Sequence, residues 1–453
     1  MSTNATLHAG TALLPTGWAR DVRIDIDAEG WIAGIAADAP PDPAAEHVPI
    51  VLPGMPNLHS HAFQRAMAGL AERRSPAGRD DFWTWRETMY RFVGRLTPED
   101  AEAVAAQLYA ELLRWGFTAV CEFHYLHHQP DGTPYANRAE MALRHVEAAR
   151  QAGIGMTMLP CLYRHGGIFG REPHQGQRRF LNDAAGLRAI IDLLPAPGPQ
   201  FARGVAPHSL RAVTPAMLAD ITEGATLIHI HAAEQVKEVA ECEAATGARP
   251  VRWLLDNAPV DPRWCLIHCT HLDAAEVAGL AASGAVAGLC PSTEASLGDG
   301  IFPLTAHREA GGRIGIGTDS HVGISVRDEL RQLETSQRLR DLARALAGDA
   351  ESPHPGQALF DAALGGGAQA SGRRIGALLA GYRADLLVLD PDHPVLAGRE
   401  GDALLDSWVF SGQDNPIRHV MCGGCWAVRD AHHVREAAIG AAYRAAVRRL
   451  AGN

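Results

Sequence analysis

The stretch Val51-Leu-Pro-Gly-Met-Pro-Asn-Leu-His-Ser-His61 determines how the rest of the chain can be arranged. It is an apolar run that ends in two histidines, which predicts a buried strand with both imidazoles at its C-terminal end. Side chains alternate between the faces of a strand, so His59 and His61 are expected to point the same way and to bind one ion together. In a chain with 22 histidines the pair could also be ordinary core or loop residues. Whether the two histidines are metal ligands depends on whether further ligands follow other strands.

The composition limits which classes of protein and which partners are expected. At 453 residues the chain exceeds the size of one ordinary core, so a large domain with a smaller one is expected. A net charge of −11 without a basic block argues against nucleic acid and membrane surfaces as partners. No signal-peptide pattern and no long apolar run occur, and the eight cysteines are scattered, which together predict a cytoplasmic protein with free thiols. Cys422-Gly-Gly-Cys425 is expected to form a turn rather than a metal site.

The chain shows two different sequence patterns. Residues 1–50 and 380–453 show short alternating segments broken by glycine, proline and aspartate, which predicts one small β-sandwich domain built from both ends. Residues 51–379 alternate apolar runs with helix-like segments, such as the one that Thr97-Pro98-Glu99-Asp100 begins and Gly116 ends. The runs number eight with the opening stretch, which predicts an α/β fold with a (β/α)8 TIM-like barrel. The other expected strands are 118–123, 154–162, 203–209, 226–232, 264–269, 285–290 and 313–319.

Candidate metal ligands stand at the ends of several of these strands. His231, His268 and Asp319 each follow a separate apolar run, as His59 and His61 do. Imidazoles with one carboxylate suit a divalent ion such as Zn²⁺. Each residue alone has an ordinary structural explanation, but their shared position predicts a metal site. Glu234 lies just beyond the His231 ligand, a position suited to a general acid or base. His268 is preferred to His271, because His271 is already in the following loop.

At this point the chain resembles the amidohydrolase superfamily, whose members are metal-dependent hydrolases on such a barrel. The resemblance includes the segment 375–390, where the chain returns to the small domain. It implies four metal ligands and two acid/base groups. The ligands are His59, His61, His231 and Asp319, and the acid/base groups are Glu234 and His268. Two-metal members bridge their ions with a lysine on strand four. Here Lys237 is the only lysine and lies past strand five, so one divalent ion, expected to be Zn²⁺, is predicted per subunit.

Longer stretches are similar to one branch, the N-formimino-L-glutamate deiminases of histidine degradation. They begin at His61-Ala-Phe-Gln-Arg, Phe82-Trp-Thr-Trp-Arg, Glu122-Phe-His-Tyr-Leu, Pro207-His-Ser-Leu-Arg, Cys290-Pro-Ser-Thr-Glu and Gly317-Thr-Asp-Ser-His. Ser296 departs from the asparagine expected there, and the loop Glu294–Gly300 is left without a role. The branch also implies a homodimer.

The implied substrate is a small molecule with two carboxylates and an amidine. Arg211 is a natural bidentate partner for a carboxylate. Gln64, Tyr125, His208 and Arg86 are further substrate-binding candidates by resemblance. Arg86 lies in an aromatic-rich segment, and the sequence leaves open whether it serves its own site, a neighbouring subunit's site or only the surface.

The predicted reaction is hydrolytic deamination of N-formimino-L-glutamate to N-formyl-L-glutamate and ammonia. Asp319 and His268 would assist the attack of water on the formimino carbon, and Glu234 would protonate the leaving nitrogen. Two alternatives remain. One is an aminohydrolase of a ring substrate such as guanine or a triazine, which the arginine after strand four disfavours. The other is a catalytically inactive barrel that acts as a scaffold.

Overall fold

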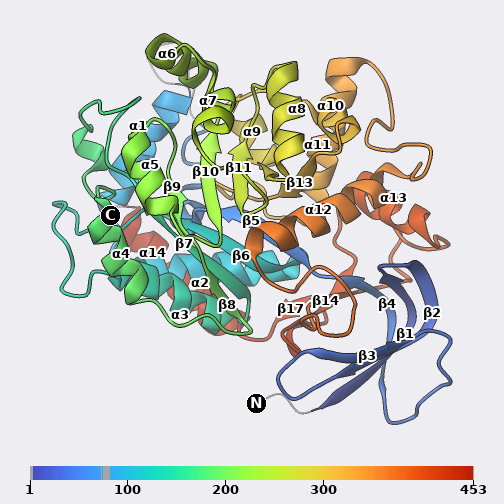
Figure 1. The fold of residues 1–453 in the computed structure, drawn as a ribbon. Helices are drawn as coiled ribbons and strands as arrows, with labels where there is room; N and C mark the ends of the chain where they lie inside the picture. The colour runs from blue at the N-terminus through green and yellow to red at the C-terminus, as the bar shows by residue number, and fades with distance from the viewer. Residues whose placement is uncertain (1–3, 73, 75–81, 452–453) are drawn as a thin grey trace.

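The computed structural model describes residues 4–72, 74 and 82–451, which form a barrel of strands covered by helices and a separate sheet beside it (Figure 1). The sheet strands are β1 (Ala5–Leu14), β2 (Gly17–Ile26), β3 (Ile32–Ala36), β4 (Glu46–Pro53), β14 (Leu386–Leu389), β15 (Ile417–Cys422), β16 (Cys425–Arg429) and β17 (His432–His433). The barrel strands are β5 (Met55–Ser60), β6 (Phe117–His124), β7 (Gly155–Leu162), β8 (Phe201–Arg203), β9 (Ala206–Pro207), β10 (Ile228–Ala232), β11 (Trp264–His268), β12 (Val286–Leu289) and β13 (Arg313–Ile316).

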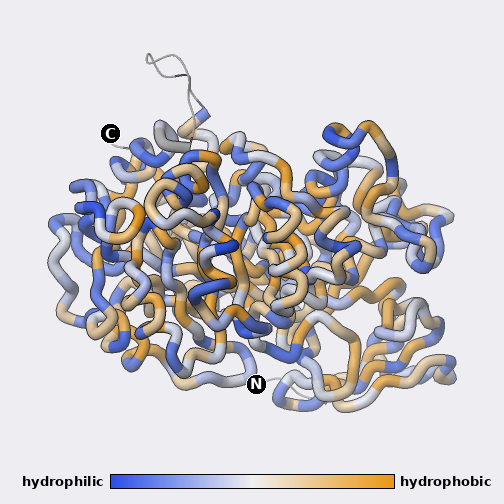
Figure 2. The backbone as a smooth tube through the Cα atoms, turned by 45° about the horizontal axis from the view of Figure 1, so that its top comes forward, coloured by the Kyte–Doolittle hydropathy of each residue, from blue (hydrophilic) through white to orange (hydrophobic). Residues whose placement is uncertain are grey.

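The helices lie mostly around the barrel. The α-helices are α1 (Phe82–Val93), α2 (Pro98–Arg114), α3 (Glu140–Ala152), α4 (Ala184–Asp192), α5 (Pro215–Thr222), α6 (Val236–Thr246), α7 (Pro250–Asn257), α8 (Ala274–Ser283), α9 (Pro291–Leu297), α10 (Leu304–Glu309), α11 (Val326–Asp341), α12 (Pro355–Ser371), α13 (Asp402–Phe410) and α14 (Glu436–Leu450). Two short 3-10 helices are η1 (Ala62–Met67) and η2 (Gln175–Gln177). Hydrophobic and hydrophilic residues alternate along the outer helices in Figure 2, as expected of helices that bury one face.

The two ends of the chain share one sheet. Its order is β17-β16-β15-β14-β4-β1-β2-β3, so the C-terminal strand β14 pairs with the N-terminal strand β4. Figure 1 shows the blue N-terminal strands beside the red C-terminal ones. Apolar residues of both ends, including Ile24, Val51, Leu386 and Met421, form one buried cluster. The prediction of a small domain drawn from both ends is thereby confirmed, and its strands hydrogen-bond in one continuous sheet.

The barrel closes through pairs between successive parallel strands. One half runs β5-β6-β7-β8, with β9 also paired to β7, and the other runs β10-β11-β12-β13. Isolated bridges join the halves, from Val205 to Ile228 and from Ser60 to Asp319. Since β8 and β9 are two pieces of one interrupted strand, the ring has the eight positions that the sequence predicts. Its carboxyl ends therefore meet at one mouth, as the active sites of such barrels do.

The opening stretch is not one strand, and that prediction is wrong. Its first residues belong to β4 of the small sheet, and β5 begins the barrel after Gly54. A Cβ atom on Gly54 would lie 2.3 Å from the Thr118 Oγ1 atom, so only glycine allows the chain to pass here. His61 lies one residue beyond β5, at the start of η1. The stretch therefore links the two parts of the fold and carries His59 and His61 to the barrel mouth.

Several local predictions are confirmed. Thr97 and Asp100 form a capping box at the start of α2, with Pro98 in its first turn. Gly423 and Gly424, with positive φ angles of 57° and 76°, form the turn between β15 and β16. The eight cysteines are free thiols. Among the described residues, no helix combines the length and apolar composition needed to cross a membrane. The domain division at residues 50 and 380 stays a prediction.

Candidate metal centre and active site

The five predicted residues meet at the barrel mouth. His59 is in β5, His61 follows it, His231 is in β10, His268 ends β11 and Asp319 lies just after β13. All five are buried, with exposed fractions between 0% for His59 and 6% for Asp319. The closed barrel therefore brings together side chains that are separated by up to 260 positions in the sequence, since 319 − 59 = 260.

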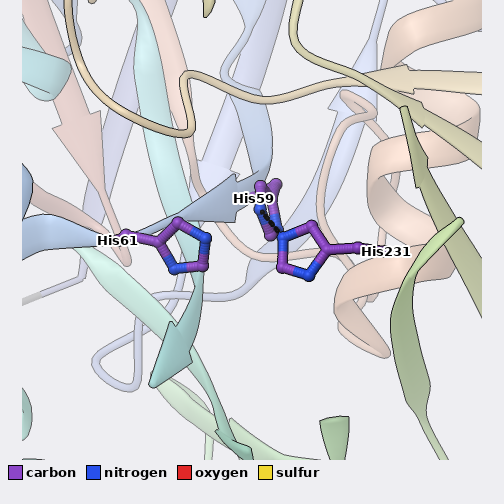
Figure 3. A group of neighbouring side chains, drawn as sticks. All are labelled: His59, His61 and His231. Carbon is purple, nitrogen blue, oxygen red and sulfur yellow. Dashed lines mark hydrogen bonds between the residues drawn. The ribbon is translucent and has the colours of Figure 1, made fainter. Parts of the chain in front are cut away.

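The imidazole nitrogens of three of these residues converge on one point, as Figure 3 shows for His59, His61 and His231. The Nε2 atoms of His59 and His231 are 3.1 Å apart. The Oδ1 atom of Asp319 lies 3.5 Å from the His59 Nε2 atom and 3.4 Å from the His61 Nε2 atom. His59, His61 and His231 form one compact group of possible ligands, and His59, His268 and Asp319 form a second, so His59 belongs to both.

The tautomers of two ligands are fixed by the backbone. The Nδ1 atom of His61 donates to the Phe123 carbonyl at 2.8 Å, and that of His231 donates to the His208 carbonyl at 2.9 Å. Each Nε2 atom therefore presents a lone pair to the centre, which is the usual arrangement of a metal-binding histidine. The ring of His59 packs edge-on against Phe123 at 5.1 Å.

The electrostatics also favour a cation. Burial lowers the pKa of His59 to about 3 and that of His231 well below the ordinary value, so both rings are neutral. Burial alone would raise the pKa of Asp319, but the neighbouring rings of His59 and His61 lower it, so this residue is a carboxylate. Neutral imidazoles around one carboxylate are the donor set that Zn²⁺ prefers. The residues present therefore fit the predicted ion.

The backbone is strained where it delivers these side chains. Ala233, His268, Cys269 and Asp319 have positive φ angles of 51°, 70°, 49° and 44°. Non-glycine residues in this region cost about 1–3 kcal/mol each and collect at functional sites. The strain falls at the carboxyl ends of β10, β11 and β13, where the predicted chemistry lies.

His268 lies between carboxylates. Its Nδ1 atom is 3.2 Å from the Glu294 Oε1 atom, and its Nε2 atom is 3.9 Å from Asp319 and 4.0 Å from Glu234. Burial alone would lower the pKa of His268, but these carboxylates together raise it to about 10. The ring therefore holds a proton at the edge of the centre. His268 also forms a compact ligand group with His59 and Asp319, so it is within reach of an ion.

Glu234 is paired with the predicted carboxylate-binding arginine. The Nη2 atom of Arg211 donates to the Glu234 Oε2 atom at 2.9 Å, and both side chains are buried. The backbone N–H of Glu234 donates to Glu238, whose Oε1 atom is 3.9 Å from the Arg211 Nε atom. Burial opposes the charge on Arg211, but Glu238 and Glu234 raise its pKa above the ordinary value. Arg211 and Glu234 therefore face the cavity as an ion pair.

One cavity of about 400 Å³ joins these groups. It is lined by His61, His231, His268 and Asp319 of the candidate metal centre and by all five predicted substrate-binding residues, which are Gln64, Arg86, Tyr125, His208 and Arg211. Gln64 donates to the Tyr125 hydroxyl at 2.8 Å. The Arg86 guanidinium lies 5.6 Å from the ring centre of Tyr90, so Arg86 lines the cavity of its own chain. The predicted residues therefore surround one space.

Sequence reasoning missed other groups at the site. Tyr163 lies one residue past β7, packs at 4.5 Å from the His208 ring and accepts a hydrogen bond from Gln177. Glu294 supplies the carboxylate behind His268, which gives part of the Glu294–Gly300 loop a role. Ser296 instead bonds the exposed Glu72 at 3.3 Å. Position at a strand end was the only signal for Tyr163. Glu294 stood only in a stretch that resembles the deiminase branch, and its partner was not predictable because Glu294 lies on α9 and His268 on β11.

A buried carboxyl anchors the helix that carries Glu294. Glu329 accepts hydrogen bonds from the Ser292 backbone and hydroxyl, and burial, which outweighs them, raises its pKa to about 8. Because this pKa is raised on folding, the associated stability is present below the ordinary value of 4.5 and is lost as the pH rises through about 8. A glutamine at this position cannot ionise. The melting temperature of Glu329→Gln, relative to that of the unmodified protein, is therefore expected to rise between pH 4.5 and about pH 8. The half-buried neighbour Asp328, changed to Asn, is the control, and a constant difference in melting temperature for Glu329→Gln would contradict the assignment.

Comparison with known proteins identifies the class. Residues 50–427 match the amidohydrolase family, and residues 4–48 match the N-terminal domain of formimidoylglutamate deiminase HutF. The crystal structure of an amidohydrolase from Brucella melitensis is 47% identical, covers 99% of this chain and 100% of its own, and superposes with a TM-score of 0.92. The chain therefore belongs to the amidohydrolase family.

Two relatives in that family differ widely in their sequence identity to this chain. The formimidoylglutamate deiminase of Pseudomonas aeruginosa is 54% identical over 95% of this chain and 96% of its own length. A 5-methylthioadenosine/S-adenosylhomocysteine deaminase of Natronomonas pharaonis is 29% identical over 89% of this chain and 86% of its own. The chain is thus much more similar to this formimidoylglutamate deiminase than to that 5-methylthioadenosine/S-adenosylhomocysteine deaminase.

Proposed function

We propose that this chain is a metal-dependent hydrolase that deaminates N-formimino-L-glutamate to N-formyl-L-glutamate and ammonia, in histidine degradation. The observation that carries the proposal is that one cavity joins the converging imidazoles to Glu234, Arg86 and Arg211. An amidine with two carboxylates needs this combination of groups. The 54% identity to a formimidoylglutamate deiminase over nearly the whole chain supports the same substrate.

The proposed cofactor is one divalent ion, Zn²⁺, held by His59, His61, His231 and Asp319. When bound, such an ion lowers the pKa of water from about 15.7 toward about 7 and so makes hydroxide available at neutral pH. The single ion follows from the absence of a lysine on the interrupted strand β8–β9, which contributes no ligand to the converging group.

The residues of the chain move the protons. Asp319 and His268 lie 3.9 Å apart beside the ion site, where they orient the attacking water and stabilise the adduct. Glu234 accepts a hydrogen bond from the amidine, takes up the proton that the attacking water loses, and delivers it to the terminal nitrogen. The bond from carbon to that nitrogen breaks, ammonia leaves, and the formyl carbonyl forms.

The arginines select the carboxylates. Arg211 pairs with Glu234 at the wall of the cavity, and Arg86 faces the same cavity from α1; each arginine is proposed to bind one substrate carboxylate. Gln64, Tyr125 and His208 are neutral groups on the walls between them. Their proposed role is to hold the chain of the substrate so that its amidine meets Glu234.

Replacing Arg211 tests this selection. Arg211→Met is expected to lower kcat/KM for formiminoglutamate by about 10- to 100-fold, since a hydrogen bond to a charged group contributes about 1.5–3 kcal/mol. Arg203→Met is the matched control, because Arg203 comes from the same interrupted strand but donates to the Ile191 carbonyl, outside the cavity. Equal kcat/KM values for Arg211→Met and the unmodified protein would contradict the role of Arg211.

The alternatives are weaker on specific grounds. A ring such as guanine has no carboxylate for Arg211 and Arg86, and the purine deaminase compared above shares only 29% identity. An inactive scaffold would not need the buried ligand set with its ordered tautomers. The proposal also includes a cytoplasmic homodimer and the division into residues 51–379 and the two ends, which sedimentation and limited proteolysis would test.

A further inference from the structure

The end of β6 holds the loop that carries His61. Glu122 on β6 is 1% exposed, and each of its carboxylate oxygens accepts a hydrogen bond from that loop. The Ser60 hydroxyl donates to the Oε2 atom at 2.6 Å, and the Ala62 backbone N–H donates to the Oε1 atom at 2.9 Å. The carboxylate therefore binds the residues on both sides of His61.

His61 depends on this support because it lies outside regular structure. It follows the last residue of β5 and precedes η1, with φ −121° and ψ 78°. Its ring is fixed by the carbonyl of Phe123, the residue next to Glu122. Its backbone N–H donates to the backbone carbonyl of Asp319 at 3.1 Å. Two consecutive residues of β6 therefore orient three consecutive residues of the ligand loop.

Glu122 also belongs to a compact buried group with His124 and His145, whose possible ligand atoms lie within 4.8 Å of one another. The geometry favours a hydrogen-bonding role over a second metal site. Besides Ser60 and Ala62, the Tyr109 hydroxyl donates to the Oε2 atom of Glu122 at 3.0 Å. Three protein donors thus already occupy the carboxylate, whose nearest approach to the His145 Nε2 atom is 3.8 Å.

We propose that Glu122 is a positioning residue for the metal ligand His61, and that it acts through Ser60 and Ala62. The inference rests on the proposed function, in which His61 binds the ion. Hydrogen bonds to a buried carboxylate are strong, and losing an outer partner of a metal ligand typically weakens metal affinity by about 10- to 100-fold. Glu122 is not among the residues that line the cavity, so its replacement is expected to act on binding of the ion through the His61 loop.

The test compares the zinc dissociation constant of variants by competition with a chromophoric chelator. Ser60→Ala removes one contact to the loop, and Glu122→Gln keeps an acceptor for Ala62 but loses the charge. Tyr109→Phe removes a hydrogen bond to the same carboxylate without touching the loop, so it controls for the general disturbance of Glu122. Melting temperatures of the zinc-free proteins identify any variant that fails to fold.

The expected result is a dissociation constant raised by about 10-fold or more in Ser60→Ala and Glu122→Gln and unchanged in Tyr109→Phe. If Glu122→Gln fails to fold, the zinc dissociation constant of Ser60→Ala alone tests the inference. Tight zinc binding by the unmodified protein with no change in Ser60→Ala would overturn this inference and leave the proposed function standing. No zinc binding by the unmodified protein would refute the proposed metal centre and this inference with it.

Discussion

Glu234→Gln is expected to retain its zinc and to lose about 10²- to 10⁴-fold in turnover of N-formimino-L-glutamate, which is the usual contribution of a general acid or base. Glutamine preserves the size of the side chain and still accepts the hydrogen bond from Arg211. It cannot carry the proton that the leaving ammonia requires. Metal analysis and ammonia release, measured on the same preparation, separate the loss of proton transfer from the loss of the ion.

The matched control is Glu241→Gln. Glu241 lies on α6, the helix that follows Glu234, lines the same cavity and approaches Lys237 at 4.0 Å. Its replacement removes one negative charge from the cavity but no group beside the ion site, so turnover is expected to persist. A Glu234→Gln variant with an ordinary rate would show that another residue protonates the leaving nitrogen. Loss of zinc from that variant would instead make Glu234 a ligand.

His231→Asn has the second large expected effect, the loss of both zinc and turnover. His231 contributes one of the three imidazole nitrogens that lie together with those of His59 and His61, and its partner at the other ring nitrogen is the His208 carbonyl. Asparagine is too short to replace the Nε2 atom at the centre. Zinc content after dialysis and the rate of ammonia release are the two measurements.

His229 provides the control on the same strand. It is equally buried two residues earlier on β10, and its ring donates to the Ala370 carbonyl at 2.9 Å, away from the centre. His229→Asn is expected to bind zinc and to lose about 1–3 kcal/mol of stability through the unmade hydrogen bond. If His229→Asn lost zinc while His231→Asn kept it, His229 and not His231 would face the metal centre.

Strand ends made most of the centre predictable. His59, His231, His268 and Asp319 each follow an apolar run, and a closed parallel barrel places all such positions at one mouth. The cap of α2 was predictable because Thr97, Pro98 and Asp100 are neighbours in the sequence. In both cases the pattern depends on residues within a single element.

The supporting carboxylates were not predictable in the same way. Glu294 and Glu122 act on residues of neighbouring strands, 26 and 62 positions away, so their partners depend on the register of the closed barrel. The break in the opening stretch depends on Thr118, which approaches Gly54 only in the folded chain. The sequence shows which groups are available, and the packing of strands decides which of them meet.

The most direct test of the central claim is ammonia release from N-formimino-L-glutamate by the zinc-loaded protein, measured beside guanine and beside the chelator-treated protein. The account predicts rapid release from formiminoglutamate, none from guanine, and loss of activity on chelation that one equivalent of zinc restores. Release from guanine but not from formiminoglutamate, or full activity in metal-free protein, would contradict it.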